Sequence, residues 1–300
     1  MPDVVLECNH IWKKIGHHVI INDLSLKLYQ GDILGFIGPN GAGKTTSIKL
    51  MLGLQSFNGG TVQIGGFDLK KNFVSAISYV GAIIENPDLY MYMSGYDNLK
   101  IAACMYHVSE SRIIEVIKLV GLENRIHDKV KKYSLGMRQR LGIAQAILHQ
   151  PKVLILDEPM NGLDPEGIQD LKKLLIRLAK EEQMGILISS HILSELECFC
   201  NRICIILKGK VIKDSSIEQI KKITNQVNYI LEVSNTHLDK ILYHYEVIDE
   251  DHIKISTTKD QVGNILKTLL LNDIAIFEMK KETISLEHAF LEATKGNIID

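Results

Sequence analysis

Short apolar runs alternate with amphipathic stretches along most of this chain, and the alternation predicts its secondary structure. Runs of consecutive apolar residues predict strands that are buried on both faces. They occur at residues 33–37, 153–156 and 186–188, and residues 77–84, interrupted by Ser78, predict a further strand. Residues 165–184, between the last two runs, carry leucine and isoleucine at helical spacing. Strand, helix and strand in this order predict a parallel crossover unit, and therefore an α/β fold.

The N-terminal residues follow a different pattern, in which apolar and polar positions take turns. Residues 4–8 and 24–28 alternate in this way on either side of Gly16. Such alternation favours strands of an antiparallel sheet with one exposed face. Residues 59–66 predict a further strand of the same sheet. We therefore expect a mixed sheet core with an antiparallel β subdomain.

Helical periodicity dominates from about residue 86 to residue 150. Ser94 and Asp97 predict a capped helix that continues to about residue 105. A second helix is predicted to begin at Ser109 and a third at Ser134. Because these helices interrupt the α/β pattern, we expect an inserted helical subdomain at about 86–150.

The pattern changes again near residue 215, after a predicted hairpin at 203–212. Strands are then expected at about 229–233, 242–248, 253–255 and 275–279. A helix is predicted at about 261–271, and Ser285 begins a final amphipathic helix. We expect one domain at 1–215 and a small α+β domain at 216–300. The second contains no recognisable ligand motif, and we interpret it as a structural or dimerisation element.

Composition limits the classes of function. Apolar residues make up 46% of the 300 residues, enough for a sizeable core. The net charge is only −2, so we expect no nucleic-acid partner. Without a signal-peptide pattern or a run near the roughly 18 apolar residues of a membrane helix, the chain is expected to be cytosolic and soluble by itself. Cys198, Cys200 and Cys204 have no second cysteine pair, which favours reduced thiols over zinc.

The most specific chemical pattern follows the apolar run at 33–37. It consists of Gly38, Pro39, Asn40, Gly41, Ala42, Gly43, Lys44, Thr45 and Thr46. Glycines let successive backbone N–H groups turn toward an anion, and the N-terminus of the following helix adds positive potential. In such a loop Lys44 reaches the β- and γ-phosphates and the Thr45 hydroxyl holds Mg²⁺. The loop therefore predicts a nucleoside triphosphate site.

Candidate catalytic residues follow two other predicted strands. Asp157 and Glu158 come directly after one of them, where α/β sheets place ligands. We expect Asp157 to hold Mg²⁺ opposite Thr45, and Glu158 to polarise the attacking water. His191 ends the other strand and is expected to hydrogen-bond the γ-phosphate. The alternatives are a helix cap for the two acids and a structural role for the histidine.

Five ordered motifs make residues 3–215 resemble the ATPases of ABC transporters. They are the phosphate loop and residues 133–141, 156–159, 162–165 and 189–191. The resemblance implies ATP and Mg²⁺ as ligands, ATP hydrolysis, and a head-to-tail dimer that binds two ATP molecules. In such a dimer each ATP lies between Lys44 of one chain and Ser134 with Gly136 of the other, and Asp164 lies at the interface.

Departures from the family pattern narrow the resemblance. Leu135 and Met137 alter the signature around Ser134, and Glu85 stands where the family usually has a glutamine that senses the γ-phosphate. We expect the Glu85 carboxylate to be a further ligand for Mg²⁺. Both departures resemble the branch that exports bacitracin and lantibiotics from bacteria. That branch implies a separate integral membrane permease and a location at the cytoplasmic face of the membrane.

The adenine site also departs from the family, in which an aromatic ring usually stacks on the base. Ile15 stands at that place and offers an apolar contact without a ring, so we expect loose base selectivity. The alternative is that Trp12 or His17 supplies the ring, although a single Trp beside Ile11 favours core packing. The aromatic run within 86–98 either faces the permease or packs inside the helical subdomain. A soluble nucleotide switch is the alternative function, although such members usually carry two ATPase modules or a long coiled coil.

Overall fold

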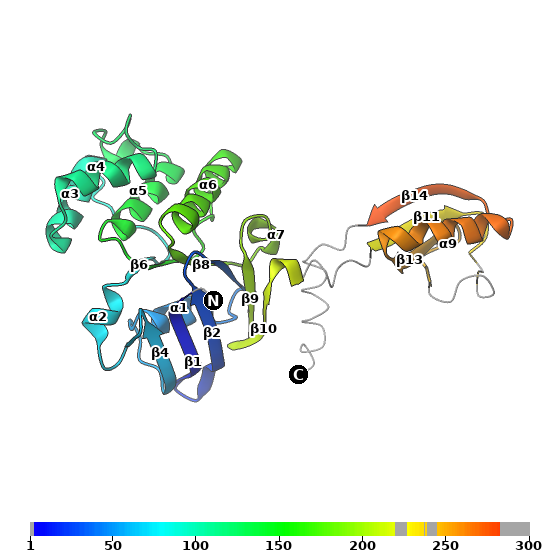
Figure 1. Ribbon diagram of the computed structural model, residues 1–300, viewed down its shortest axis with the longest axis horizontal. Helices are drawn as coiled ribbons and strands as arrows, with labels where there is room; N and C mark the ends of the chain where they lie inside the picture. The colour runs from blue at the N-terminus through cyan, green and yellow to red at the C-terminus, as the bar shows by residue number, and fades with distance from the viewer. Residues whose placement is uncertain (1–2, 220–226, 237, 239–244, 283–300) are drawn as a thin grey trace. The chain divides into compact units, whose positions relative to one another are not determined.

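The chain forms two compact units, Met1–Ser216 and Ile217–Asp300. The computed structural model describes residues 3–219, 227–236, 238 and 245–282 (Figure 1). Among these residues no helix is both long and apolar enough to cross a membrane. The five cysteines are free thiols, and Cys8, Cys200 and Cys204 are buried.

An antiparallel sheet forms one layer of the N-terminal unit. It contains β1 (Val4–Ile15), β2 (His18–Tyr29), β4 (Gly59–Ile64) and β5 (Phe67–Asp68) in the order β2-β1-β4-β5. Gly16 turns the chain between β1 and β2 with a positive φ of 58°. The predicted antiparallel sheet is confirmed, and β4 pairs with β1 as expected.

A second, six-stranded sheet carries the chemistry of the N-terminal unit. It contains β3 (Ile33–Ile37), β6 (Val80–Ile83), β7 (Val153–Leu156), β8 (Gly185–Ser190), β9 (Arg202–Leu207) and β10 (Lys210–Ser216). Their order is β10-β9-β3-β8-β7-β6, and every pairing except that of β10 with β9 is parallel. Strands β3, β7 and β8 are buried at every position, as their apolar runs predict. Because these three strands are parallel neighbours, the loops after them meet at one edge of the sheet.

Helices connect and flank the strands of this sheet. The phosphate loop leads into α1 (Lys44–Met51), and α6 (Pro165–Glu181) links β7 to β8 as the predicted crossover. Short helices α2 (Phe73–Ile77) and α7 (Leu193–Leu196) were not expected from the sequence. The prediction of a strand over 77–84 is wrong at its start, because Ile77 ends α2 and β6 begins only at Val80. A short apolar run does not by itself distinguish a strand from a buried helical turn.

The helical subdomain lies beyond β6, on the far side from β1, β2 and β4 (Figure 1). It contains α3 (Gly95–Tyr106), α4 (Glu110–Leu119), the 3₁₀ turn η1 (Val130–Lys132) and α5 (Leu135–Ile147). The predicted capping box is present, since Ser94 accepts from the Asp97 N–H and the Asp97 side chain bonds back to Ser94. Ser109 precedes α4 as predicted, but its hydroxyl bonds Ser111 and caps no backbone group.

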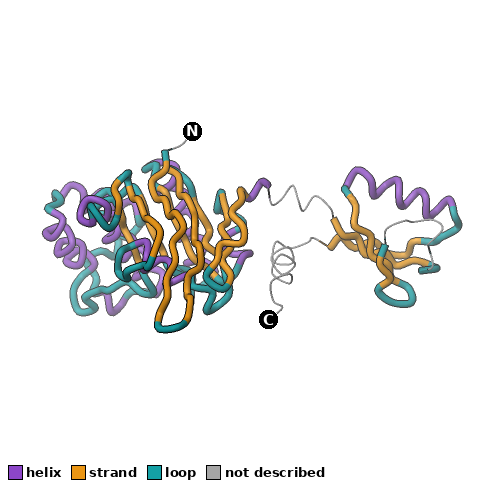
Figure 2. Tube along the Cα trace, turned by 90° about the horizontal axis from the view of Figure 1, so that it is seen from below, coloured by secondary structure: helices purple, strands orange, loops and turns teal. Residues whose placement is uncertain are grey.

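In the C-terminal unit, the described residues form a four-stranded antiparallel sheet and the helix α9 (Lys259–Leu271). The strands are β11 (Val227–Val233), β12 (Glu246–Val247), β13 (His252–Thr257) and β14 (Ile276–Glu282). The strand order is β12-β13-β11-β14. The helix lies along one face of this sheet (Figure 2). Tyr229, Leu231 and Ile253 are among the buried residues of its core. Of the strand expected at 242–248, only Glu246–Val247 is a described strand; residues 242–244 and the helix expected at Ser285 lie outside the described residues.

Candidate nucleotide-binding site

The phosphate loop lies between β3 and α1, as its sequence predicts. Gly41 and Gly43 have φ values of 80° and 104°, in the left-handed region that favours glycine. Gly38 has no room for a side chain, because a Cβ there would collide with the backbone oxygen of Ile206. The loop therefore needs glycine for two different reasons, conformation and close approach.

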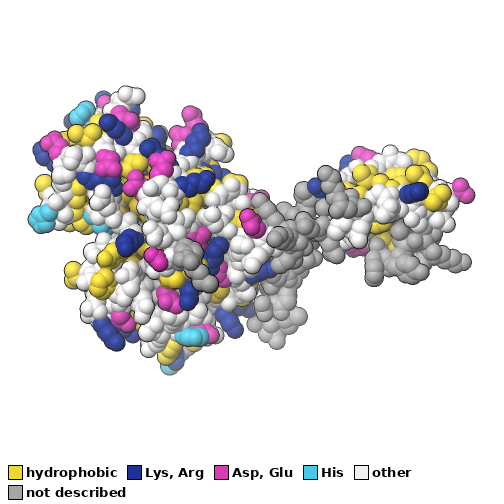
Figure 3. Space-filling model, in the orientation of Figure 1, with side chains coloured by type: hydrophobic (Ala, Val, Ile, Leu, Met, Phe, Trp, Pro, Cys, Tyr) yellow, Lys and Arg dark blue, Asp and Glu magenta, His cyan; other side chains and the backbone are white. Residues whose placement is uncertain are grey.

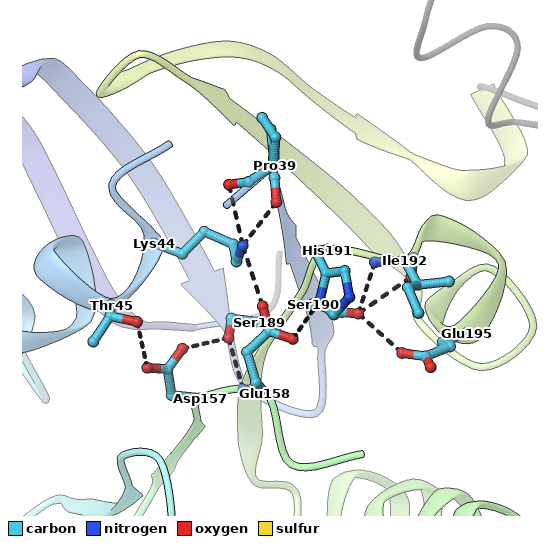
Figure 4. A network of polar contacts seen from close by, with 11 residues as sticks. Pro39, Lys44, Thr45, Asp157, Glu158, Ser189, Ser190, His191, Ile192 and Glu195 are labelled. Atoms are coloured by element: carbon cyan, nitrogen blue, oxygen red, sulfur yellow. Dashed lines mark hydrogen bonds and ion pairs between the residues drawn. The ribbon is translucent and has the colours of Figure 1, made fainter. Parts of the chain in front are cut away.

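Lys44 projects from the first turn of α1 back into this loop. Its side chain is only 6% exposed, and Nζ donates to the carbonyl oxygen of Gly38 at 2.7 Å. The same ammonium lies 3.2 Å from Oε1 of Glu158 (Figure 4). A buried ammonium needs anionic or polar partners to offset its desolvation. The loop and β7 together hold this charge in position to meet a phosphate.

Asp157 accepts hydrogen bonds at both of its carboxylate oxygens. The Thr45 hydroxyl donates to Oδ2 at 2.7 Å, and the Ser189 hydroxyl donates to Oδ1 at 2.5 Å (Figure 4). Asp157 is buried, so the carboxylate is held firmly in one orientation. A hydroxyl and a carboxylate are the hard oxygen ligands that Mg²⁺ prefers, and water and phosphate oxygens usually complete its shell. Thr45 and Asp157 therefore fit the expected metal pair.

Glu158 lies between a lysine and a histidine. Its Oε1 faces Lys44, and its Oε2 lies 2.8 Å from Nδ1 of His191. Burial opposes ionisation of the Glu158 carboxyl, but the hydrogen bonds from His191 and Lys44 outweigh it and lower the pKa. The side chain is therefore an oriented carboxylate, as general-base chemistry requires.

Two serines at the end of β8 support this arrangement, and sequence reasoning assigned neither a role. Ser189 accepts from the backbone N–H of Glu158 at 2.8 Å while it donates to Asp157. Ser190 donates to Oε2 of Glu195 at 3.0 Å and accepts from the N–H of Ile192 at 3.0 Å. One serine thus couples β7 to β8, and the other shapes the loop that presents His191.

Glu85 follows β6 with a φ of 63°, and its side chain is 71% exposed. The carboxylate lies 3.8 Å from Nζ of Lys49 on α1. It borders a cavity of about 240 Å³ whose lining also includes Thr45, Asp157 and Glu158. Glu85 is thus a neighbour of Thr45 and Asp157, without a described bond to either residue.

The predicted interface residues form a separate group at two helix N-termini. Ser134 caps α5 by accepting from the Met137 N–H at 3.2 Å, and Asp164 caps α6 by accepting from the Gly167 N–H at 3.0 Å. A Cβ placed on Gly136 would lie 3.7 Å from the Cα of Gly167, so the two helix starts are adjacent.

A cavity of about 360 Å³ opens beside the phosphate loop. Its lining consists of Ile20, Asn40, Gly41, Gly43, Lys44, Thr45, Thr46, Glu158, Asn161 and His191. Ser134, Gly136 and Asp164 are not in this lining. Their chain neighbours Leu135 and Leu163 line the smaller cavity together with Thr45, Asp157 and Glu158. Ile15 does not line the cavity beside the phosphate loop either; it ends β1, half exposed. Ile20 on β2 is the aliphatic residue in the lining, and sequence reasoning did not single it out.

Comparisons with known proteins agree with this geometry. The family described as "ABC transporter" matches residues 21–161. A protein named "Uncharacterized ABC transporter ATP-binding protein YhcH" from Bacillus subtilis (strain 168) is 45% identical over 97% of this chain and 96% of its own length. "Bacitracin transport ATP-binding protein BcrA" from Bacillus licheniformis is 36% identical over 98% and 99%.

A third relative and a solved structure resemble the N-terminal part. "Lantibiotic transport ATP-binding protein SrtF" from Streptococcus pyogenes is 43% identical over 71% of this chain and 92% of its own length. A solved "ATP binding subunit of ABC transporter" is 29% identical, with a TM-score of 0.64, and the match covers 73% of this chain and 92% of that one. The α/β fold expected from the motifs is therefore confirmed.

Proposed function

The chain belongs to the ABC transporter family as an ATP-binding subunit, and we propose that it hydrolyses ATP to power export of an antimicrobial peptide, such as bacitracin or a lantibiotic, through a separate membrane permease. Relatives named for bacitracin transport align with it over almost their whole length, which supports this peptide class. The proposed location is the cytoplasmic face of the bacterial membrane, where ATP is available.

The observation that carries hydrolysis is the position of Glu158 between Lys44 and His191. In the proposed reaction Lys44 binds the γ-phosphate, and Glu158 accepts a proton from the attacking water. His191 orients the Glu158 carboxylate and hydrogen-bonds the phosphate as charge moves onto it. Thr45 and Asp157 would hold Mg²⁺, and this ion would neutralise part of the negative charge of the phosphates. Each group acts by position and electrostatics, which is how enzymes accelerate phosphoryl transfer.

The proposed active form is a head-to-tail dimer. Ser134 and Gly136 stand at the N-terminus of α5, where free backbone N–H groups attract an anion. These residues do not line the cavity of their own Lys44, and in the proposed dimer they approach the phosphates bound by the second subunit. Asp164, at the adjacent start of α6, would lie between the two sites.

The proposed permease contact is a groove between the six-stranded sheet and the helical subdomain. Its volume is about 530 Å³, and its lining includes Phe73, Pro87, Met105 and Tyr106. Phe73 and Met105 are exposed apolar side chains, as expected where another protein packs. Within the segment 86–98, Tyr90, Tyr92 and Met93 are also exposed rather than packed in the subdomain core.

Reconstitution tests the proposed function. The full chain is co-expressed with the multi-span protein encoded beside its gene, and the complex is placed in vesicles with bacitracin or a lantibiotic. We expect co-purification and ATP-dependent movement of the peptide across the bilayer. A chain that hydrolyses ATP but binds no multi-span protein would contradict the proposed role in export, but not the proposed ATPase activity.

Glu85 is expected to tune the Mg²⁺ dependence of the reaction. Glu85→Gln should raise the Mg²⁺ concentration for half-maximal ATPase activity by roughly three- to tenfold, because an amide is a weaker hard-metal ligand than a carboxylate. The measurement is a Mg²⁺ titration of ATP hydrolysis, with Asp88→Asn as the control for an exposed acid of the same loop. If ATPase rate, Mg²⁺ dependence and transport were all unchanged in Glu85→Gln, the metal role would be wrong.

Base selectivity is expected to be loose. The lining of the cavity beside the phosphate loop contains Ile20 but no Phe, Tyr or Trp, so no such ring there stacks on the base. GTP should displace a fluorescent ATP analogue with an affinity within roughly tenfold of that of ATP, because an aromatic stack is worth only about 0.5–1.5 kcal/mol. Ile20→Tyr, which places a ring in the cavity lining, should increase the preference for ATP. Failure of GTP to compete at a hundredfold excess over ATP would count against the prediction.

A further inference from the structure

We propose that two copies of this chain associate through their C-terminal units, by antiparallel pairing of β14 of one copy with β14 of the other. The contact would join two four-stranded sheets into one continuous sheet. It differs from the ATP-dependent dimer because it involves none of the nucleotide-site residues. It also identifies the partner as a second copy of this chain rather than a different ATPase.

Strand β14 is an edge of its sheet. It pairs with β11 on one side, and no described strand pairs with its other side. Every second backbone N–H and C=O of such a strand points outward, which makes the edge a template for another strand. In Figure 1, β14 lies along the outside of its unit.

Exposed apolar side chains accompany this edge. Phe277 and Met279 are 67% and 46% exposed, and Leu270 and Leu271, at the end of α9, are also exposed. Figure 3 shows hydrophobic side chains gathered on the part of the C-terminal unit where β14 and α9 are drawn. An apolar edge that remained in water would favour association, so a partner of matching chemistry is expected.

The charges of β14 select a second copy in one register. Directly opposite residues in an antiparallel pair either both point their backbone groups at each other or both point them away. When two identical strands pair in this way, the residue numbers of any two opposite residues must therefore add up to an even number. If Met279 lies opposite itself, Glu278 lies opposite the partner copy's Lys280, and this pairing occurs twice by symmetry.

The neighbouring registers are unfavourable. A shift of the two-fold axis to Glu278 or to Lys280 places identical charges directly opposite one another, which destabilises an antiparallel pair. Glu278 and Lys280 already project to the same side of β14, since their charged groups lie 2.9 Å apart within one chain. In the dimer, the pair within each copy is replaced by two equivalent pairs between the copies. Every Glu278 and every Lys280 therefore keeps a partner of opposite charge. Phe277 lies at a register shift of the β14–β11 pairing, between Glu278 and Ile276, so the proposed pairing is centred on the regular residues that follow it, where Met279 would face Met279.

Disulfide cross-linking of the full chain without nucleotide tests the register. In a background with the exposed Cys104 and Cys198 replaced by Ser, Met279→Cys should form a covalent dimer on mild oxidation. Opposite Cα atoms in an antiparallel pair lie about 4.5–5.5 Å apart, within disulfide range. Glu278→Cys alone and Lys280→Cys alone should not cross-link, but a mixture of the two should, because these positions lie opposite one another in the proposed register. Equal cross-linking of all single variants, or none of Met279→Cys, would overturn the proposal.

Sedimentation of charge variants gives an independent test that does not alter the apolar residues. Glu278→Lys and Lys280→Glu should each weaken nucleotide-free dimerisation by roughly tenfold, because each creates two like-charge pairs. The double variant Glu278→Lys with Lys280→Glu should restore the affinity, since it exchanges the two charges. A monomeric wild-type chain at all concentrations, or a double variant no better than the single variants, would contradict β14 pairing. ATP-induced dimerisation should persist in all of them, so failure here would leave the proposed ATPase untouched.

Discussion

Replacing Glu158 with glutamine should lower the rate of ATP hydrolysis by roughly 10²–10³-fold while ATP binding is retained. The carboxylate lies between Lys44 and His191, and its lowered pKa keeps it ionised and able to accept a proton. An amide of the same size can still contact both neighbours but cannot act as a base. The substitution should also preserve the backbone, because Gln tolerates the φ of 49° at this position about as well as Glu.

Two measurements on Glu158→Gln separate chemistry from binding. Phosphate release should fall, while the affinity for ATP should stay within a few-fold of wild type. Slow hydrolysis should also accumulate the ATP-bound dimer, which size-exclusion chromatography detects. Glu166→Gln, which changes an exposed acid in the first turn of α6, should retain wild-type turnover. Undiminished hydrolysis in Glu158→Gln would remove this residue from the proposed role.

Gly136→Asp should lower ATP hydrolysis by about a hundredfold or more without loss of stability, because it places a carboxylate where the partner's phosphates are expected. Within one subunit there is room for the side chain: the nearest heavy atoms to a Cβ at this position lie 3.7 Å away or farther. An acid in the first turn of α5 also interacts favourably with the helix dipole. The defect should therefore appear only when two subunits meet around ATP.

The matched control is Gly136→Asn, which has nearly the same size and no charge. It should retain substantially more activity than Gly136→Asp, and both should unfold at the wild-type temperature. By contrast, Gly142→Ala in the same helix should destabilise the fold, because its Cβ would collide with Pro87. Normal ATP-dependent dimerisation of Gly136→Asp would show that Gly136 does not face the second nucleotide.

Much of the fold could be predicted from local patterns. The apolar runs of β3 and β7 were located to the residue, since a strand buried on both faces has an unbroken apolar sequence. The capping box at Ser94 was located equally well, because its two hydrogen bonds depend on residues only three positions apart. The predictions that were wrong concern short elements. Ile77 satisfies an apolar environment at the end of a helix as well as in a strand, and only packing distinguishes the two.

The candidate site likewise contains some residues that could be predicted from the sequence and others that could not. The phosphate loop, Asp157, Glu158 and His191 could be proposed from sequence because each is tied to the end of a recognisable strand. The supporting roles of Ser189 and Ser190 could not, because serine is common and its partners are remote along the chain: Ser189 donates to a carboxylate 32 positions away. Ile20, rather than Ile15, lines the cavity for a similar reason, since the bend of a β-hairpin decides which aliphatic residue faces the loop.

The chemical groups of this protein and the local structures that carry them follow from the order of its residues, because phosphate loops, caps and buried strands depend on neighbouring residues. Which of these groups meet depends on the tertiary structure. It brought Thr45 to Asp157 across 112 positions, and it left Ser134 and Gly136 off the cavity of Lys44. It also placed β14 at the edge of its sheet, although the sequence of an amphipathic strand does not indicate which strand will pair with it. Strand order and helix placement arise from packing over long sequence separations, which local patterns do not encode.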